Sequence, residues 1–251
     1  TAEFIDFMYE NELLDVLSKD GKAPGGYCTS IPDYKAPFIF SNFNGTSGDV
    51  DVLTHEAGHA FADFRAVRKG YIRALQSPTM ESCECHSMSM EFLTQDFHKN
   101  FFGPATEKYE IDHCEDSLIF IPCGCLVDEF QHRVYENPDM TPAQRNELWA
   151  SLEKKFRPWL DFGDLPFYGR GAGWQRQLHI YQMPFYYIDY CIAQCVALGF
   201  LRLSRENFES ALEKYVDFLK KTGSVSLTEL IEGAGLESPF GAGALVKTAE
   251  N

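Results

Sequence analysis

The segment His55-Glu56-Ala57-Gly58-His59 constrains this chain more than any other feature, because it places two imidazoles four residues apart. On a helix, residues four apart lie on the same face, so both rings can reach one metal ion. Glu56 lies about 100° further around the helix, where its carboxylate can serve a metal-bound water without itself being a ligand. This arrangement is typical of zinc hydrolases, although so short a motif also occurs by chance on solvated helices.

The composition is that of a folded domain and excludes two classes of partner. The 251 residues suffice for one or two domains, and 45% of them are apolar. The formal net charge of −15 argues against binding to a nucleic-acid backbone. The apolar run Tyr186–Leu201 contains Asp189 and Gln194, which would be costly in lipid. We therefore expect neither a nucleic-acid nor a membrane partner.

The eight cysteines do not have the spacing of a structural zinc site or of a small disulfide scaffold. Their closest pairs are Cys83/Cys85, Cys123/Cys125 and Cys191/Cys195. We interpret them as reduced thiols, mostly in the core of a cytoplasmic protein. No signal peptide opens the sequence, which begins without Met inside an amphipathic pattern. We therefore expect a piece of a longer polypeptide.

Hydrophobic periodicity predicts a mainly α fold with one small sheet. The aromatic and β-branched runs 27–31 and 37–43 are expected to be strands. Helix caps are expected at Asp49, Thr141 and Ser204. The expected helices cover 2–18, 49–68, 77–97, 104–137 with a break near Pro122, 142–156, 186–203, 205–221 and 227–233.

A catalytic zinc site takes three protein ligands, and the helix expected over 77–97 offers several candidates for the third. Glu81, Glu84 and Glu91 share one face of this helix. His86 points about 200° away from Glu84. The face therefore indicates a carboxylate ligand without choosing among three, and a solvated acidic stripe is the alternative.

Three motifs, in order and spacing, resemble the catalytic half of the M3-family metallo-oligopeptidases, in the oligoendopeptidase F branch related to thimet oligopeptidase. They are the 55–59 motif, the run Glu84–Glu91 that begins twenty-five positions beyond His59, and the run His179–Tyr186 followed by Tyr190. The resemblance covers nearly the whole chain. It implies a mainly α, zincin-like metallopeptidase domain with one small β-sheet beside the metal helix. It also implies that residues 1–251 are the catalytic domain of a longer chain that lacks its N-terminal helical half here.

The resemblance also implies roles for individual residues. His55, His59 and Glu84 become the ligands of one Zn²⁺ per chain, and Glu56 becomes the general base. Glu81 and Glu91 become carboxylates that support the ligands or the fold.

The third motif is expected to stabilise the transition state. Phenol and imidazole donors stabilise the oxyanion that forms when a peptide bond is attacked. The resemblance implies this role for His179, Tyr190 and Tyr186. For the tyrosines the alternative is a purely structural role in an aromatic core helix.

The resemblance also places a substrate-binding sheet edge in Ala36–Asn44. A side chain at Gly58 would be expected to crowd the metal or its carboxylate partner.

These features together predict a zinc-dependent endopeptidase that cleaves short oligopeptides, with Glu56 activating the attacking water. Short peptides and the N-terminal half of the same protein are the expected partners. Two alternatives stay open. One is a metal-binding fragment without independent activity. The other is a di-iron carboxylate bundle for storage or oxygen chemistry, built from E-x-x-H pairs, which leaves His55 and the third motif unexplained. Those pairs are Glu56/His59, Glu110/His113 and Glu129/His132.

Overall fold

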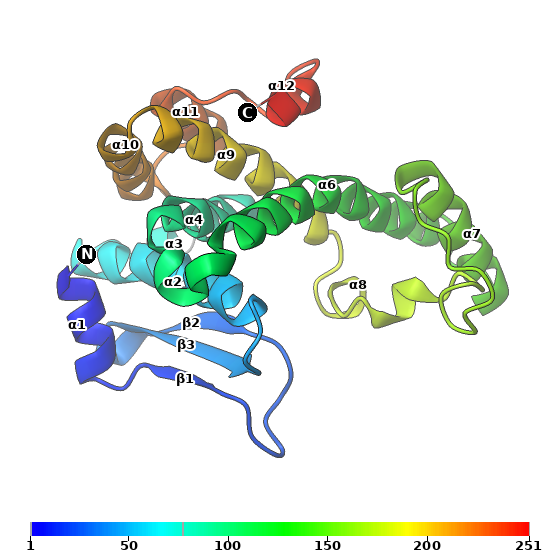
Figure 1. Cartoon of the computed structure of the whole chain (residues 1–251), viewed down its shortest axis with the longest axis horizontal. Helices are drawn as coiled ribbons and strands as arrows, with labels where there is room; N and C mark the ends of the chain where they lie inside the picture. The colour runs from blue at the N-terminus through cyan, green and yellow to red at the C-terminus, as the bar shows by residue number, and fades with distance from the viewer. Residues whose placement is uncertain (1, 77, 251) are drawn as a thin grey trace. The chain divides into compact units, whose positions relative to one another are not determined.

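The computed structural model describes residues 2–76 and 78–250, which divide into two compact units (Figure 1). The first unit contains the residues up to Ile111 and those from Ala193 onward, and the second contains Asp112–Ile192. The predicted mainly α fold with one small sheet is confirmed. None of the helices in these described ranges has the length and apolar content that a membrane crossing requires.

The sheet of the first unit has three strands in the order β1-β3-β2, so β3 (Ala36–Phe43) is the central strand. It pairs in parallel with β1 (Leu14–Leu17) and antiparallel with β2 (Tyr27–Ile31). β3 therefore has a neighbouring strand on each side, and Ile39 and Phe40 are paired with both. The expectation that Ala36–Asn44 provides the sheet edge is wrong, because the edges are β1 and β2.

The edge was predicted in the wrong strand because residues 2–18 were expected to form one helix, so the strand β1 was not predicted. Helix α1 (Ala2–Glu10) ends early, since Glu12 adopts a left-handed backbone with φ 53°. The amide of Ile39 then donates to the carbonyl of Leu13 at 3.0 Å and starts the β1 ladder. A strand of only four residues shows too little alternation to be distinguished from a helical turn.

Helix α2 (Gly48–Arg68), which carries the 55–59 motif, packs against the sheet and against α4 (Met80–Leu93). Asp49 does not cap α2 as expected. Its carboxylate instead accepts the backbone amides of Asn44 and Gly45, at 3.0 and 2.7 Å, and so ties the preceding loop to the helix. The helix predicted over 77–97 begins at Met80, and Ser77, its expected start, lies outside the described residues.

The backbones of α2 and α4 approach closely at Gly58. A Cβ atom there would lie 2.6 Å from the carbonyl oxygen of His86 and 2.7 Å from Cα of Ser87. Both distances are well inside van der Waals contact, and the obstructing atoms are backbone. Gly58 is therefore required by the helix crossing, and not, as the sequence suggested, by space around the metal or its carboxylate partner.

Helix α10 (Phe208–Lys221) supports this crossing through the buried residue His86. The Tyr215 hydroxyl donates to the carbonyl oxygen of His86 at 2.7 Å. The Nε2 atom of His86 lies 3.0 Å from Oγ1 of Thr222, and its ring contacts Phe218. Burial lowers the pKa of His86 to about 3, so the imidazole is neutral. His86 thus points away from the acidic face of α4, as expected.

The C-terminal helices differ from expectation in one cap. Ser204 does not begin a helix, because α9 (Tyr187–Glu206) continues past it and its hydroxyl donates to the carbonyl of Leu201. Asn207 caps α10 instead, accepting the amide of Ser210 at 2.9 Å. The other helices of this unit are α11 (Leu227–Ala234), α3 (Arg73–Gln76), α5 (Lys99–Phe102) and α12 (Ala244–Glu250).

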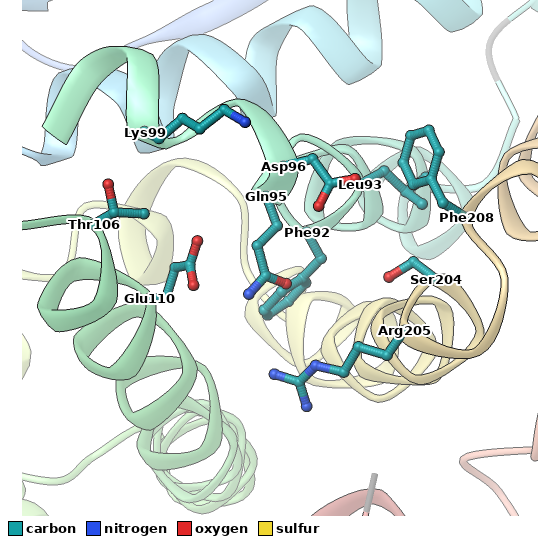
Figure 2. Close-up of a pocket in the computed structure, with 10 residues that line it drawn as sticks. All are labelled: Phe92, Leu93, Gln95, Asp96, Lys99, Thr106, Glu110, Ser204, Arg205 and Phe208. Atoms are coloured by element: carbon teal, nitrogen blue, oxygen red, sulfur yellow. The ribbon is translucent and has the colours of Figure 1, made fainter. Parts of the chain in front are cut away.

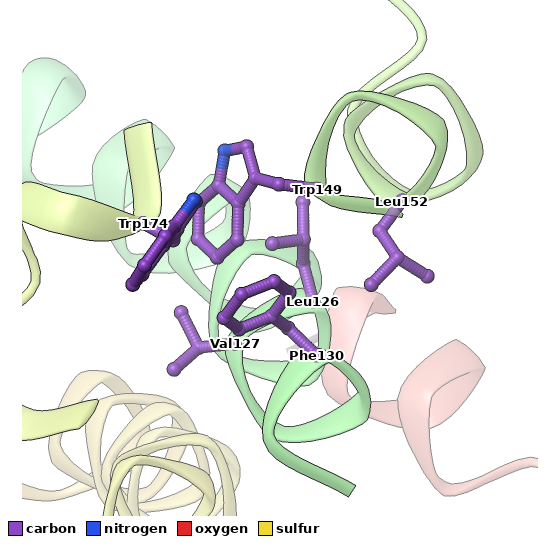
Figure 3. Packing of buried hydrophobic residues seen from close by; sticks show 6 residues of the cluster. All are labelled: Leu126, Val127, Phe130, Trp149, Leu152 and Trp174. Atoms are coloured by element: carbon purple, nitrogen blue, oxygen red, sulfur yellow. The ribbon is translucent and has the colours of Figure 1, made fainter. Parts of the chain in front are cut away.

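The second unit is built on the part of α6 (Thr106–Glu136) from Asp112 onward, on α7 (Pro142–Phe156), on the short α8 (His179–Gln182) and on the start of α9. Thr141 caps α7 through a capping box with Gln144, as predicted. The predicted break at Pro122 is wrong, because α6 is continuous through it. Pro122 removes one backbone donor, while buried side chains on both sides keep the helix packed. Figure 3 shows the core of this unit, formed by Leu126, Val127, Phe130, Trp149, Leu152 and Trp174.

We predict that Gly58→Ala separates α2 from α4 and lowers the free energy of unfolding by about 2 kcal/mol or more, as overpacking does. The matched control is Gly48→Ala in the first turn of α2. An added Cβ there meets only Oγ1 of Thr46, at 3.6 Å. That control is expected to be neutral or slightly stabilising, because alanine favours helices. Chemical denaturation of both variants measures the difference, and equal stabilities would contradict the role given to Gly58.

Candidate metal centre

Three side chains from α2 and α4 bring their donor atoms together. Nε2 of His55 lies 3.2 Å from Oε2 of Glu84, and Nε2 of His59 lies 3.4 Å from the same oxygen. Three ligands at zinc bond lengths in a tetrahedral arrangement would be separated by about 3.3–3.5 Å. Within residues 2–76 and 78–250, these form the one group of three or more His, Cys, Asp or Glu side chains able to hold a metal ion. The geometry therefore favours Glu84 among the three carboxylates that the sequence left open.

The electrostatics of this cluster are those of a cation site. Glu84 is only 2% exposed, and burial would raise its pKa. Hydrogen bonds to His55 and His59 outweigh this effect and hold the pKa well below its usual range. Burial likewise opposes protonation of His55, but hydrogen bonds to Glu84 and Glu91 raise its pKa well above the usual value. The raised pKa of His55 means that a proton on this ring competes with a metal ion for the same place.

Glu91 orients one of the two imidazoles. Its Oε1 lies 2.7 Å from Nδ1 of His55, on the opposite side of the ring from Glu84. A carboxylate on the far nitrogen fixes the tautomer and direction of a metal-binding histidine. Glu81, on the same helical face, makes no hydrogen bond or ion pair to the residues described here. Glu81 and Glu91, which the sequence alone could not distinguish, therefore have different surroundings.

Glu56 lies on α2 between the two histidines in sequence and is 7% exposed. Burial raises its pKa, while the nearby His55 and His59 partly offset this. In the part of the chain described, Oε2 of Glu56 has no hydrogen-bond partner. A Cβ atom built on Gly26 would lie 3.6 Å from its Oε1, so the residues that precede β2 lie beside this carboxylate. Glu56 is thus a desolvated carboxylate with one oxygen still available.

The residues of the third motif form an aromatic cluster within the second unit. Nε2 of His179 lies 3.5 Å from the hydroxyl of Tyr190, and the rings of Tyr186 and Tyr190 are 4.8 Å apart between centroids. Tyr187 also packs on His179, with centroids 5.0 Å apart. The structure therefore brings His179, Tyr186 and Tyr190 together, and Tyr187 is an additional neighbour.

Gln177 determines which nitrogen of His179 carries the proton. The amide Nε2 of Gln177 lies 2.8 Å from Nδ1 of His179. Because an amide nitrogen can only donate, Nδ1 accepts and the neutral ring is protonated at Nε2. Gln177 was not among the predicted site residues, although its position two residues before a candidate histidine is a signal that points to it.

The other E-x-x-H residues are engaged elsewhere. Glu129 is bonded by Arg133 and Lys155, and His132 pairs with Asp128 at 3.5 Å. Glu110 lies 3.8 Å from the buried His98. Glu129 is therefore held in ion pairs with Arg133 and Lys155, and Glu110 lies beside His98.

A surface cavity of about 370 Å³ in the first unit is lined by none of the metal-cluster residues (Figure 2). Its walls carry both signs of charge, from Lys99 and Arg205 and from Asp96 and Glu110. We assign it no part in metal binding.

The cysteines are less buried than expected. Cys85, Cys191 and Cys195 are buried, and the other five are half-buried. The core placement predicted for most of them holds for these three.

The model of peptidase family M3 matches residues 3–249. The chain belongs to peptidase family M3. The prediction of an M3-family metallopeptidase is thereby confirmed at the level of the family. Relatives of this M3 chain include an oligoendopeptidase F homologue of Borreliella burgdorferi, 24% identical over 84% of the chain. Another is the oligopeptidase PepF of Bacillus subtilis, 24% identical over 91% of the chain.

Among solved structures, this M3 chain is similar to one described as PZ peptidase A with inhibitor 2. The identity is 51%, the TM-score is 0.95, and the match covers 99% of this chain and 44% of that one. The chain spans 36% and 34% of the two bacterial relatives. This M3 chain therefore corresponds to between a third and a half of the proteins that it matches.

We predict that Glu91→Gln weakens zinc binding about 10- to 100-fold, because the carboxylate that orients His55 is lost. Glu81→Gln is the matched control on the same helix and is expected to bind zinc as the unaltered protein does. Competition with a fluorescent zinc chelator measures both affinities. Equal weakening in the two variants would contradict a specific role of Glu91.

We also predict that zinc binding releases protons and weakens as the pH falls. The raised pKa of His55 means that its ring keeps a proton to higher pH than a free imidazole does, and zinc must displace that proton. Lowering the pH strengthens the proton as a competitor. Calorimetry in two buffers of different ionisation enthalpy measures the released protons, and identical apparent enthalpies would contradict the prediction.

Proposed function

We propose that this chain carries the catalytic centre of a zinc-dependent endopeptidase that hydrolyses short oligopeptides. The observation that carries the proposal is the meeting of three donor atoms of His55, His59 and Glu84, all within 4.8 Å of one another. Membership of peptidase family M3 and the names of the two bacterial relatives, an oligoendopeptidase F homologue and an oligopeptidase, support the same activity.

Zinc is the metal that best fits this donor set. Two imidazoles and one carboxylate are typical of catalytic zinc sites, which leave a fourth position open. The separations of 3.2 and 3.4 Å from Glu84 agree with tetrahedral coordination. One zinc ion per chain, held by His55, His59 and Glu84, would supply a water of lowered pKa and polarise the scissile carbonyl.

Glu56 is proposed as the general base. Burial raises its pKa toward the range in which a carboxylate can both take and return a proton. Its unpartnered Oε2 would accept the proton of the attacking water. The same carboxyl group would then deliver that proton to the leaving amine. Its neighbour Glu84 has a lowered pKa and stays ionised, so the two carboxyl groups have different tasks.

His179 and Tyr190 are proposed to stabilise the oxyanion, with Tyr186 as a third candidate. The proton on Nε2 of His179, set by Gln177, makes this ring a donor. The hydroxyl of Tyr190 lies beside the same nitrogen. Two donor groups 3.5 Å apart could both contact one oxyanion.

The free edge of β2 is the proposed binding edge for the substrate backbone, in place of the edge first expected in Ala36–Asn44. β2 is paired with β3 on one side only. Its start lies beside Glu56, through Gly26. An extended peptide added to this edge would be held by main-chain hydrogen bonds and would tolerate many sequences.

The chain is further proposed to act as the catalytic domain of a longer protein. It spans about a third of the two relatives, so a remaining segment of similar proteins would provide the rest of the substrate-binding surface. Experiments on activity therefore use the full-length protein. They also test the alternative of a metal-binding fragment, which would bind zinc without cleaving peptides when isolated.

We predict that Glu56→Gln in the full-length protein keeps zinc and lowers kcat about 100- to 10,000-fold, because the proton acceptor is lost. Mass spectrometry of a mixed short-peptide library, with and without chelator, measures cleavage. Glu81→Gln is the control and should cleave normally. Normal cleavage by Glu56→Gln would exclude the assigned base, and products that persist after metal removal would exclude a metallopeptidase.

Metal analysis separates the peptidase from the di-iron bundle. One zinc per chain is expected, and it should be lost in His59→Ala, which removes one of the two imidazole donors. Two irons per chain in the unaltered protein would support the bundle instead.

A further inference from the structure

The turn between α8 and α9, residues 183–186, has an unfavourable backbone. Phe185 adopts φ 65°, in the left-handed region, where a bulky aromatic residue is rarely found. Such strain persists only where surrounding contacts hold it. The turn joins His179 of α8 to Tyr186 and Tyr190, so its shape determines how these three side chains meet.

Gln131 of α6 provides the polar contact that holds this turn. Its side chain is 1% exposed, and its Oε1 accepts the backbone amide of Phe185 at 2.9 Å. Its Nε2 donates to the carbonyl oxygen of Val127 at 3.4 Å, so both polar atoms of the side-chain amide have a partner. A buried amide left without such a partner would be costly. Gln131 and the strained residue therefore depend on each other.

Ring contacts from the next turn of α6 hold the side chain of the same residue. The ring of Phe185 packs on His132 and on Tyr135, with centroids 4.9 Å away in each case. On either side of the turn, Ile180 and Tyr187 pack against the tryptophan core of the second unit. The backbone and side chain of Phe185 are thus both fixed from residues 131–135.

We propose that Gln131 is a positioning residue of the peptidase, which holds Phe185 in its left-handed conformation so that Tyr186 and Tyr190 lie against His179. Gln131 does not touch the substrate in this proposal and acts through the turn. The inference rests on the proposed function, since it assumes that the His179 cluster serves the reaction. Its structural part, the dependence of the turn on Gln131, can be measured without any activity.

The first experiment is hydrogen exchange on the full-length protein, read at the amide of Phe185. Gln131→Leu removes the acceptor, and exchange at Phe185 is expected to accelerate at least about tenfold, because a hydrogen-bonded amide is protected. Gln131→Glu retains an acceptor oxygen at the same reach and is expected to keep the protection. Glu136→Gln, an exposed position at the end of α6, is the control. Unchanged exchange in Gln131→Leu would overturn the proposal.

The second experiment compares kcat and KM for the same variants. Gln131→Leu is expected to lower kcat by about 10- to 100-fold through misplacement of the donors, with KM and zinc content unchanged. Gln131→Glu should restore most of kcat. Should Gln131→Leu fail to fold, Gln131→Asn replaces it, because its amide is one methylene too short to reach Phe185. A lower melting temperature with an unchanged kcat would mean a purely structural role and would overturn the proposal.

A double-mutant cycle with Tyr190→Phe shows whether Gln131 acts through the cluster. If it does, Gln131→Leu lowers kcat much less in the Tyr190→Phe background than in the unaltered protein. Independent, multiplying losses would contradict action through Tyr190. Failure of the proposed function is distinguishable, because then the unaltered protein would show no chelator-sensitive cleavage while the exchange result for Gln131 would stand on its own.

Discussion

The close contact between α2 and α4 at Gly58 is the constraint on which the metal cluster depends. The two imidazoles come from α2 and the carboxylate of Glu84 comes from α4, so the crossing sets the distance between them. The carbonyl oxygen of His86 is the atom that a Cβ at Gly58 would strike, and it also accepts the hydroxyl of Tyr215. One peptide group is therefore shared by the packing of three helices. Van der Waals contact and a hydrogen bond together hold the donors where a divalent cation can bind.

Glu84 and Glu56 carry the same chemical group, but their surroundings shift their pKa values in opposite directions. Glu84 and Glu56 are both buried, and burial alone would raise both pKa values. Direct hydrogen bonds to the imidazoles reverse the effect for Glu84, whereas Glu56 makes none to either ring within the described ranges. One carboxyl group therefore remains an anion suited to a metal, and the other keeps a raised pKa suited to proton transfer. Pairs of acids whose pKa values are driven apart commonly divide the roles of a reaction in this way.

Most helices and the pair His55 and His59 could be predicted from local sequence patterns. The choice of the third carboxylate and the edge of the sheet could not, because they depend on tertiary contacts. The spacing of His55 and His59, and the Thr141 cap of α7, depend only on neighbours in sequence. The choice of Glu84 over Glu81 and Glu91 depends on where α4 crosses α2, which helical periodicity does not encode. The strand Leu14–Leu17 was too short to show alternation, so the edge of the sheet was assigned wrongly. The continuity of α6 through Pro122 likewise depends on packing beyond the local sequence.

The first unit is assembled from two stretches of chain separated by the whole of the second unit. Tyr215 lies 129 residues beyond His86, yet its hydroxyl supports the peptide at the crossing of α2 and α4. A ribosome adding about 5–20 residues per second needs on the order of ten seconds to cover that interval. Throughout it, α2 and α4 have emerged while α10 has not. The nascent polypeptide therefore completes this candidate metal centre late in translation, after the intervening unit has had time to collapse around its tryptophans.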